Sequence, residues 1–325
     1  MKNVMKLALA ATFAGLAFAS SQAADMKKIA ISTIVEVPAL LETRDGVLEG
    51  LAKRGFVVGK NLEVDYQNAN GNMPTQQQIA KKFVGGNPDV IVPITTPTSQ
   101  SMVAATKTIP IVFTTVTDPV KAKLISKYEK PGANVTGVSD AAPIGEQLDF
   151  FKKIIPGLKK IGFIYNPGLD NALATLGWMK EQGATRGIEV VESPAPTTNE
   201  VILATKKLIG KVEAIYIPND TTVVSALEAI IKIGWDTDTP IFAGETGAVD
   251  RGAIGSVGLD YLELGRITGD MVADVLEGKN PGEIDAVIAY TVLTKFIVAV
   301  NKGSAAKMGV TIPADILASA TKVIE

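Results

Sequence analysis

The stretch Ile91–Ser101 reads IVPITTPTSQS, an apolar run that breaks into hydroxyl side chains around Pro97. A few residues later, Ile111–Pro119 repeats this pattern as IVFTTVTDP. Short apolar runs bounded by polar turn residues are typical of buried strands in a parallel sheet. Ligands of parallel α/β sheets bind outside the carboxyl ends of the strands. We therefore expect these two strand ends to face a ligand cleft, with a second wall opposite them.

Around this stretch, short apolar runs alternate with longer segments of helical period, which is the pattern of parallel α/β units. The series runs from residue 27 to about Asp140 and starts again with a helical segment at Ile144. Two consecutive halves with the same order of strands and helices favour two similar lobes over one large sheet. The sequence therefore predicts an α/β fold with two Rossmann-like lobes.

The first 23 residues have the pattern of a secretory signal peptide. Lys2 and Lys6 precede an apolar run over residues 7–19, and Ser21-Gln22-Ala23 provides a cleavage site of small residues. The apolar run is too short for a membrane span, which needs about 20 residues. No cysteine follows it to carry a lipid. We expect the mature chain to be free in the periplasm.

Composition excludes several classes of function. Removal of the two signal-peptide lysines from 32 basic and 34 acidic residues leaves a net charge of −4, so nucleic acid is not an expected partner. The chain has no His and no Cys, which excludes Ser-His-Asp catalysis, thiol catalysis and zinc sites built on these ligands. A glycosidase using only carboxylates remains open, although no spacing favours one. We expect a binding protein, not an enzyme, without cofactor or metal.

Polar side chains follow most of the predicted strands, and these positions are the candidate site. Ser, Thr, Asn and Asp are also favoured helix N-caps, so any one of them alone is more often a cap than a ligand contact. More hydroxyl side chains follow Ile94 than the single residue that one N-cap requires. Thr96 before Pro97 fits an N-cap followed by a first helical proline, which leaves Thr98 and Ser99 with free hydroxyls. The full set of candidates is Glu36, Thr96, Thr98, Ser99, Thr115, Thr117, Asp118, Tyr165, Asn166, Asp220 and Glu245.

The chemistry of these candidates fits an α-amino acid. A helix N-terminus with free hydroxyls suits one carboxylate, because backbone amides and the helix dipole favour negative charge. No Lys or Arg lies within 91–101 to neutralise a phosphate. Asp220 and Glu245, in the second half, could each pair with an ammonium group, and which of them does so stays open. Tyr165 follows a predicted strand and could stack on a ring.

Six segments of the chain are similar to one family. They are TTPTSQS (95–101), IPIVFTTVTDPV (109–120), PGANVTGVSD (131–140), IGFIYNPG (161–168), RGAIGSVGLDYLELG (251–265) and GVTIPADIL (309–317). In this order they resemble the ABC-transporter substrate-binding proteins related to tryptophan-binding lipoproteins. The resemblance covers essentially the whole mature chain.

The resemblance implies a type I periplasmic-binding-protein fold with three hinge crossings and a cleft that closes on its ligand. Crossings near Asp140, residues 259–260 and residues 291–295 would give a first lobe of residues 24–140 with about 260–292. The second lobe would take residues 141–259 with about 293–325. The resemblance also implies a monomer that delivers an amino acid, often aromatic, to an inner-membrane permease and its ATPase.

By position, the resemblance assigns roles to several candidates. Thr96, Thr98 and Ser99 match the loop that meets the ligand carboxylate, and Thr115, Thr117 and Asp118 match the next loop. Asn166 and Asp220 match loops of the second lobe, with Asp220 as the expected ammonium partner.

This chain differs from the family pattern at two positions, so the pattern does not decide which ligand side chain is bound. Close relatives often have Glu-His-Pro where this chain has Glu36-Val37-Pro38, and some have a small residue in place of Glu245. A sensing module for a membrane receptor, or a binding protein for a different small solute, is the alternative function.

Overall fold

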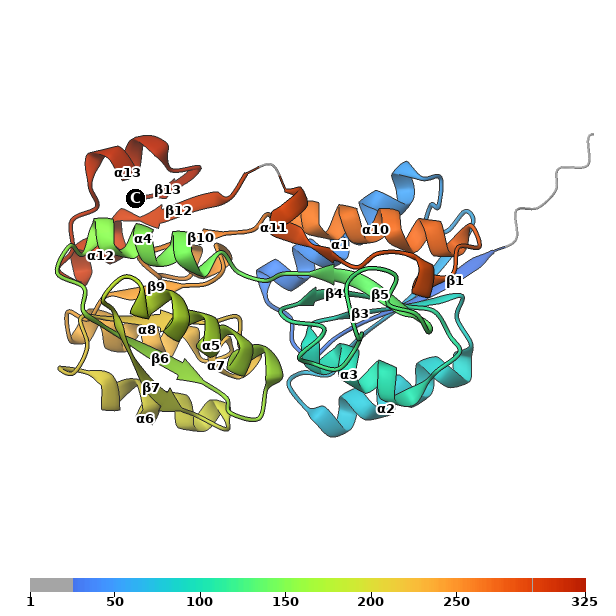
Figure 1. The fold of residues 1–325 in the computed structure, drawn as a ribbon, viewed down its shortest axis with the longest axis horizontal. Coiled ribbons are helices and arrows are strands. Elements are labelled where there is room, and N and C mark those ends of the chain that lie inside the picture. Colours follow the sequence, from blue (N-terminus) through green and yellow to red (C-terminus); the bar gives the residue numbers. More distant parts are fainter. Residues whose placement is uncertain (1–25, 294) are drawn as a thin grey trace, which may run out of the picture.

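The computed structural model describes residues 26–293 and 295–325, and it folds into two α/β lobes set side by side (Figure 1). The predicted signal peptide, residues 1–23, lies outside the described residues. Within the part of the chain that the structure describes, no helix has the length and apolarity needed to cross a membrane.

The first lobe is built on a six-stranded, fully parallel sheet with strand order β11-β5-β4-β3-β1-β2. Helices α1 and α10 cover one face of this sheet, and α2 and α3 cover the other (Figure 1). The strands are β1 (Lys27–Thr33), β2 (Leu62–Asn68), β3 (Val90–Ile94), β4 (Ile111–Val116), β5 (Val135–Ser139) and β11 (Val287–Ile288). The helices are α1 (Pro38–Lys53), α2 (Met73–Gly86), α3 (Thr96–Ala105), α10 (Tyr261–Leu276), the short 3-10 helix η1 (Pro281–Glu283) and α11 (Ala289–Val292).

The second lobe has a seven-stranded sheet with strand order β13-β12-β10-β9-β8-β6-β7. The strands are β6 (Lys160–Tyr165), β7 (Glu189–Pro194), β8 (Ala214–Ile217), β9 (Ile241–Ala243), β10 (Gly255–Gly258), β12 (Ile297–Asn301) and β13 (Lys322–Ile324). The helices are α4 (Ile144–Ile154), α5 (Asp170–Ala184), α6 (Thr198–Leu208), α7 (Thr221–Val224), α8 (Leu227–Asp236), α9 (Gly247–Asp250), α12 (Lys302–Lys307) and α13 (Ala314–Ser319).

The chain passes between the lobes three times. The first passage joins β5 to α4, the second joins β10 to α10, and the third joins α11 to β12. Strand β10 runs toward the first lobe and β12 returns from it, so this neighbouring pair is antiparallel, whereas the other strand pairs of this sheet are parallel. Apart from this pair, the predicted two lobes with parallel sheets and three crossings are confirmed.

Helices α1 and α10 touch through glycines, which lets their backbones approach closely. A Cβ atom on Gly265 would overlap the carbonyl oxygen of Thr43 and lie 2.9 Å from the Cα of Gly46. Gly269 faces Gly50 in the same way, and a Cβ atom there would lie 3.0 Å from the Gly50 Cα. Because α10 begins at Tyr261, directly after the second crossing, this packing fixes the position of that tyrosine.

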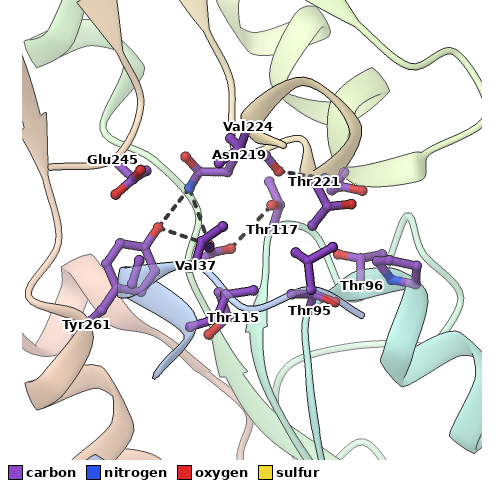
Figure 2. A pocket seen from close by; sticks show the side chains of 16 residues that line it. Val37, Thr95, Thr96, Thr115, Thr117, Asn219, Thr221, Val224, Glu245 and Tyr261 are labelled. Carbon is purple, nitrogen blue, oxygen red and sulfur yellow. Dashed lines mark hydrogen bonds between the residues drawn. The ribbon is translucent and has the colours of Figure 1, made fainter. Parts of the chain in front are cut away.

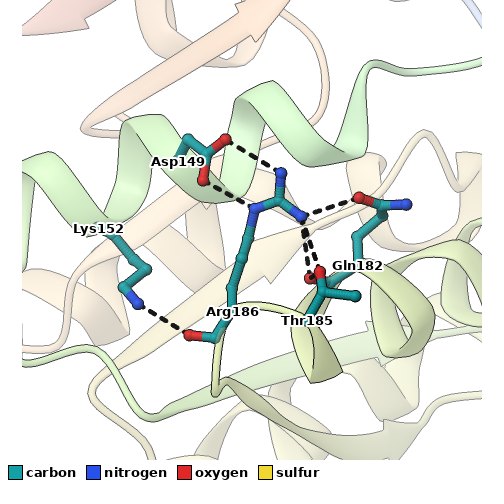
Figure 3. Close-up of polar contacts among 5 residues, drawn as sticks. All are labelled: Asp149, Lys152, Gln182, Thr185 and Arg186. Carbon is teal, nitrogen blue, oxygen red and sulfur yellow. Dashed lines mark hydrogen bonds and ion pairs between the residues drawn. The ribbon is translucent and has the colours of Figure 1, made fainter.

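A network around Arg186 fastens α4 to the end of α5 (Figure 3). The guanidinium of Arg186 donates two hydrogen bonds to Asp149 on α4, of 2.8 and 3.0 Å, and one of 2.8 Å to the side chain of Gln182 on α5. Lys152 on α4 donates to the Arg186 carbonyl oxygen at 2.8 Å. The helix that follows the first crossing is therefore anchored within the second lobe.

Candidate functional site

A cavity lies between the two lobes, at the carboxyl ends of their strands (Figure 2). The first lobe contributes residues that follow β1 and β3, the end of β4, and Asp140 after β5. The second lobe contributes the start of α5 and the residues that follow β8 and β9. This placement agrees with the general position of ligands in parallel α/β sheets.

The turn after β3 presents Thr95 and Thr96 to the cavity, not the two hydroxyls that we predicted. Helix α3 begins at Thr96, and the left-handed Thr95, at φ +89°, makes the turn from the strand. Thr98 pairs with the Thr95 hydroxyl at 3.0 Å, and Ser99 donates to the Thr95 carbonyl oxygen at 2.8 Å. Both side chains are fully buried and lie outside the lining.

The predicted roles of these hydroxyls are thus reversed. Thr96, which we expected to cap the helix, makes no capping hydrogen bond. Its Oγ1 atom is buried without a hydrogen-bond partner among the described residues, and the side chain lines the cavity. The reason is that the helix starts one residue earlier than Pro97 suggests, which turns Thr98 and Ser99 back toward Thr95.

Thr115 and Thr117, at the end of β4, both line the cavity. The register between β4 and β5 shifts between Phe113 and Val116, and Thr115 adopts a left-handed backbone with φ +55°. Such a conformation is strained for a β-branched residue, at a cost of about 1–3 kcal/mol. Strain of this kind is frequent at binding sites, where the surrounding structure holds it in place.

Asp140 is the centre of a cluster of polar side chains in the cavity. The sequence pattern had indicated only the end of the first lobe at this residue. Its side chain is 2% exposed and accepts hydrogen bonds from the Thr117 hydroxyl (3.2 Å), the Asn219 amide (3.3 Å) and the Tyr261 hydroxyl (3.3 Å). Asn219 also donates to the Tyr261 oxygen at 2.8 Å. Burial raises the pKa of Asp140, and these three hydrogen bonds oppose that rise.

Two further acceptors, on residues that line the same cavity, have no partners of their own among the described residues. The Nδ2 atom of Asn171 donates to the Asn219 carbonyl oxygen at 2.8 Å. Asn171 and Asn219 both line the cavity, and their Oδ1 atoms are buried and accept no hydrogen bond from the described residues. Buried polar atoms are nearly always paired, so these acceptors are suited to a ligand that brings N–H donors.

Glu245, after β9, is the second carboxylate in the lining. Its side chain is 7% exposed, and its Oε2 accepts the Gly247 N–H at 2.7 Å. Burial raises the pKa of Glu245 to about 7. Of the predicted candidates, the structure therefore brings Thr96, Thr115, Thr117 and Glu245 together around one cavity.

Asp220 does not face the cavity, which corrects its predicted role as ammonium partner. Its fully buried carboxylate accepts the backbone N–H groups of Asn166 (2.6 Å), Thr222 (2.8 Å) and Val223 (3.3 Å). These bonds cap α7 and tie it to the loop after β6. Burial raises the pKa of Asp220 to about 6. The Asn166 side chain bonds to the Thr222 hydroxyl at 2.9 Å and is also absent from the lining.

Three other candidates also lie outside the lining. Asp118 accepts the Lys121 N–H at 2.9 Å, which makes it a turn-forming residue. The Tyr165 hydroxyl donates to Glu192 at 2.8 Å, and Glu36 accepts the Tyr66 hydroxyl at 2.9 Å. A strand end alone does not reveal which way a side chain points, so sequence reasoning could not separate these residues from the true lining.

The charge of the lining defines its chemistry. Among the described residues that line it, Asp140 and Glu245 carry the only carboxyl groups, and no Lys or Arg is present. No group of three or more His, Cys, Asp or Glu side chains within residues 26–293 and 295–325 is placed to hold a metal ion. The cavity can therefore accept a small molecule that carries a cationic group, while the start of α3 can meet a negative group.

The two lobes are drawn together by direct contacts beside the cavity. Gln100 on α3 donates to Asp170, at the start of α5, at 2.7 Å. Lys121 in the first lobe donates to the Leu173 carbonyl oxygen on α5 at 3.4 Å. With the Asn219–Asp140 bond, these contacts describe a closed arrangement of the lobes.

The chain is similar to several characterised or solved proteins. It is 41% identical over 258 residues to a tyrosine-binding protein of Clostridioides difficile, covering 79% of this chain and 75% of that protein. A conserved domain protein from Vibrio cholerae is 46% identical, with a TM-score of 0.88 over 92% of this chain and 100% of that chain. An ABC domain in complex with L-Trp from Streptococcus pneumonia is 31% identical, with the same TM-score and the same coverage of both chains.

The two-lobed architecture is that of type I periplasmic binding proteins, as solute-binding proteins with bound myo-inositol and 5-methylthioribose share it at 18% and 15% identity. The model of the ABC transporter substrate binding protein family matches residues 28–324. With a cleft between two lobes and a family model that covers nearly the whole chain, this protein belongs to the ABC transporter substrate binding protein family.

Proposed function

We propose that this protein captures a free α-amino acid with an apolar or aromatic side chain in the cavity between its lobes, for delivery to an ABC importer. One observation carries the proposal. Asn171 and Asn219, whose buried Oδ1 atoms have no partner among the described residues, line the same cavity as the Asp140 carboxylate, and the unpaired Thr96 hydroxyl lies there at a helix N-terminus. A zwitterion satisfies both sets of groups.

The start of α3 is the proposed carboxylate site. The first-turn amides of a helix have no partner within the helix, and the dipole adds positive potential there. The Thr96 Oγ1 atom is available as a further donor. A carboxylate carries one negative charge, so it needs no Lys or Arg to neutralise it here.

Asp140 is the proposed ammonium site, in place of Asp220. An ammonium group has three N–H donors, which Asp140, Asn171 Oδ1 and Asn219 Oδ1 can accept. A charge taken out of water must be paired, and the ligand would neutralise a carboxylate whose pKa is already raised by burial. Because Asn219 belongs to the second lobe, one ammonium group would touch both lobes and favour their closure.

The ligand side chain is proposed to be apolar or aromatic. Val37, Leu40, Val224 and the ring of Tyr261 supply apolar surface to the lining. The relatives described as binding tyrosine and as complexed with L-Trp support an aromatic ring. Val37 adds to this apolar wall.

We place the protein in the periplasm, as a monomer that meets an inner-membrane permease and its ATPase. Membership of the family supports the importer partners, and the signal-peptide pattern of residues 1–23 supports export.

A thermal-shift screen of the mature chain against the twenty amino acids, with sugars and purines as controls, tests the ligand class. A ligand at 100 times its Kd stabilises by about 2.7 kcal/mol. The protein should first be unfolded and refolded, and the released small molecules identified by mass spectrometry, because a bound amino acid could copurify. A shift with a sugar or purine alone would overturn the proposal.

Uptake assays separate transport from sensing. A strain lacking the gene should lose high-affinity uptake of the labelled amino acid, and complementation should restore it. Unchanged uptake, together with a lost transcriptional or motile response to the amino acid, would instead assign a sensing role.

A further inference from the structure

Glu245 is a buried carboxylate in the cavity that recognition of a zwitterion does not use. Figure 2 shows Thr96 and Thr221 on one side of the cavity and Glu245 with Tyr261 on the other, with Thr117 and Asn219 between them. A ligand whose carboxylate lies at Thr96 and whose ammonium lies near Asn219 would extend its side chain toward Glu245.

The surroundings of Glu245 leave part of its carboxyl group available. Its Oε2 atom accepts the Gly247 N–H at 2.7 Å, and the Ala248 N–H lies near enough to favour the charged form of the carboxyl group. No Lys or Arg of the described residues forms an ion pair with it. The Tyr261 hydroxyl, which lies on the same side of the cavity in Figure 2, donates instead to Asp140.

A buried acceptor without a full set of donors is costly, which argues for a partner that arrives with the ligand. Loss of hydrogen bonds to a buried polar group costs free energy, and it costs more for a charged group. Burial is the main cause of the raised pKa of Glu245, about 7, and the Gly247 N–H, the charge of Arg251 and the Ala248 N–H only partly oppose that rise. A donor from the ligand would relieve this cost in the closed state only.

We propose that Glu245 determines specificity by accepting a hydrogen bond from an O–H or N–H group on the ring of an aromatic amino acid. This inference rests on the proposed function, since it requires the ligand to be held at Thr96 and Asp140. Phenol and indole rings carry such a donor at their edge, and the phenyl ring of phenylalanine does not.

The neighbouring wall favours a neutral donor on a ring over a cationic side chain. Val37 and Leu40, from the loop after β1 and the first turn of α1, line the cavity as apolar surface. A ring can contact this surface while its edge reaches the carboxyl group. A site that is built to hydrogen-bond a substrate O–H or N–H rejects the analogue that lacks it, because its own polar group is then left unpaired.

Titration calorimetry of the refolded, ligand-free protein with tyrosine, tryptophan, phenylalanine and lysine tests the inference. The wild type should bind tyrosine or tryptophan at least tenfold more tightly than phenylalanine. Glu245→Ala should lower the affinity for the donor-bearing ligand by tenfold or more and change that for phenylalanine by less than threefold. Glu245→Gln, which keeps an acceptor oxygen, should lie between these two.

The outcomes separate this inference from the proposed function. If the wild type binds no amino acid, the proposed function fails and the inference fails with it. If it binds aromatic amino acids and Glu245→Ala weakens tyrosine, tryptophan and phenylalanine equally, or none of them, only the inference is overturned. Tighter binding of lysine than of any aromatic amino acid would overturn it too, by assigning Glu245 to a cation. Should Glu245→Ala not fold, the ligand ratios of Glu245→Gln decide in the same way.

Discussion

The carboxylate of Asp140 lies 3.3 Å from the Nδ2 atom of Asn219, although Asp140 follows β5 of the first lobe and Asn219 follows β8 of the second. The hydroxyl of Tyr261, directly after the second crossing, bonds to both. Residues next to the first two crossings, Asp140 and Tyr261, therefore form one buried polar cluster with Asn219 of the second lobe. A ligand that pairs with Asp140 therefore binds at residues that connect the two lobes in the closed arrangement.

Asp140→Asn should weaken amino-acid binding by at least tenfold, because it removes the proposed charge partner of the ammonium group. It should lower the melting temperature of the ligand-free protein only slightly, because the Asn NH₂ group cannot accept a hydrogen bond that one Asp140 oxygen accepts now, while removal of a buried charge offsets part of that loss. Asp220→Asn is the matched control. It should lower stability by about 1–2 kcal/mol, because an Asn side chain has one acceptor oxygen and cannot keep both the cap of α7 and the bond to the Asn166 N–H. It should change affinity by less than threefold. Calorimetry and thermal melts that gave the reverse pattern would restore Asp220 as the ammonium partner.

Thr96→Val should reduce affinity about threefold to tenfold with little change in stability, because the Thr96 hydroxyl has no partner among the described residues to lose. Thr98→Val is its counterpart in the same helix turn. It breaks the 3.0 Å contact with the Thr95 hydroxyl and should cost about 1 kcal/mol of stability. Equal effects of the two variants on binding would contradict the assignment of Thr96 to the ligand.

Gln100→Ala should speed ligand release about threefold to tenfold, since its 2.7 Å bond to Asp170 joins the lobes only when they are closed. This range corresponds to a net hydrogen-bond contribution of about 0.5–1.5 kcal/mol. Stopped-flow fluorescence measures the release rate, and small-angle scattering measures closure. Lys232→Ala, which removes an exposed pair with Asp236 within α8, should have no effect on either.

The ligand-free protein should become more stable as the pH falls from about 7 to about 4.5. The folded-state pKa of Glu245, about 7, is above its ordinary value of 4.5, so the folded state binds more protons than the unfolded state in this window. Stability then rises on acidification. The change due to Glu245 is on the order of 2–3 kcal/mol. Asp220, with a pKa of about 6, acts in the same direction.

Denaturant titrations at several pH values check this prediction, with Glu245→Gln as the variant that should show a smaller slope. Below about pH 4 the trend should reverse. Arg186 lowers the pKa of Asp149, and the stability due to that pair is lost as the pH falls through the folded-state pKa. A wild type whose stability increases steadily from pH 4.5 to pH 7 would refute the role of the buried carboxylates.

Gly265→Ala should destabilise the protein by about 1–3 kcal/mol, because its Cβ would overlap the Thr43 carbonyl oxygen and separate α1 from α10. It should also weaken ligand binding by displacing Tyr261 at the start of α10. Gly177→Ala, in the interior of α5, places its Cβ in open space and should instead stabilise by about 0.5–1 kcal/mol. Similar stability changes for the two would show that the helix contact is not tight.

The residue pattern alone was enough to predict the architecture, because hydrophobic period and turn residues are local signals. It also placed a binding site at strand ends, which follows from the geometry of parallel sheets. The residues Thr115, Thr117 and Glu245 could be located in this way. The same reasoning overestimated Asp118, Tyr165, Asn166 and Asp220, because a polar residue after a strand can equally cap a helix or close a turn.

Residue order and type were thus sufficient for the two-lobed fold, the site at the strand ends and the lack of any basic group within 91–101. They were not sufficient to show which polar side chains face the cavity. Asp140, Asn219 and Tyr261 come from three separate segments, and their meeting depends on how the chain crosses between the lobes. Whether Thr96 or Thr98 faces the cavity depended on the left-handed turn at Thr95, a backbone detail fixed by packing rather than by residue type.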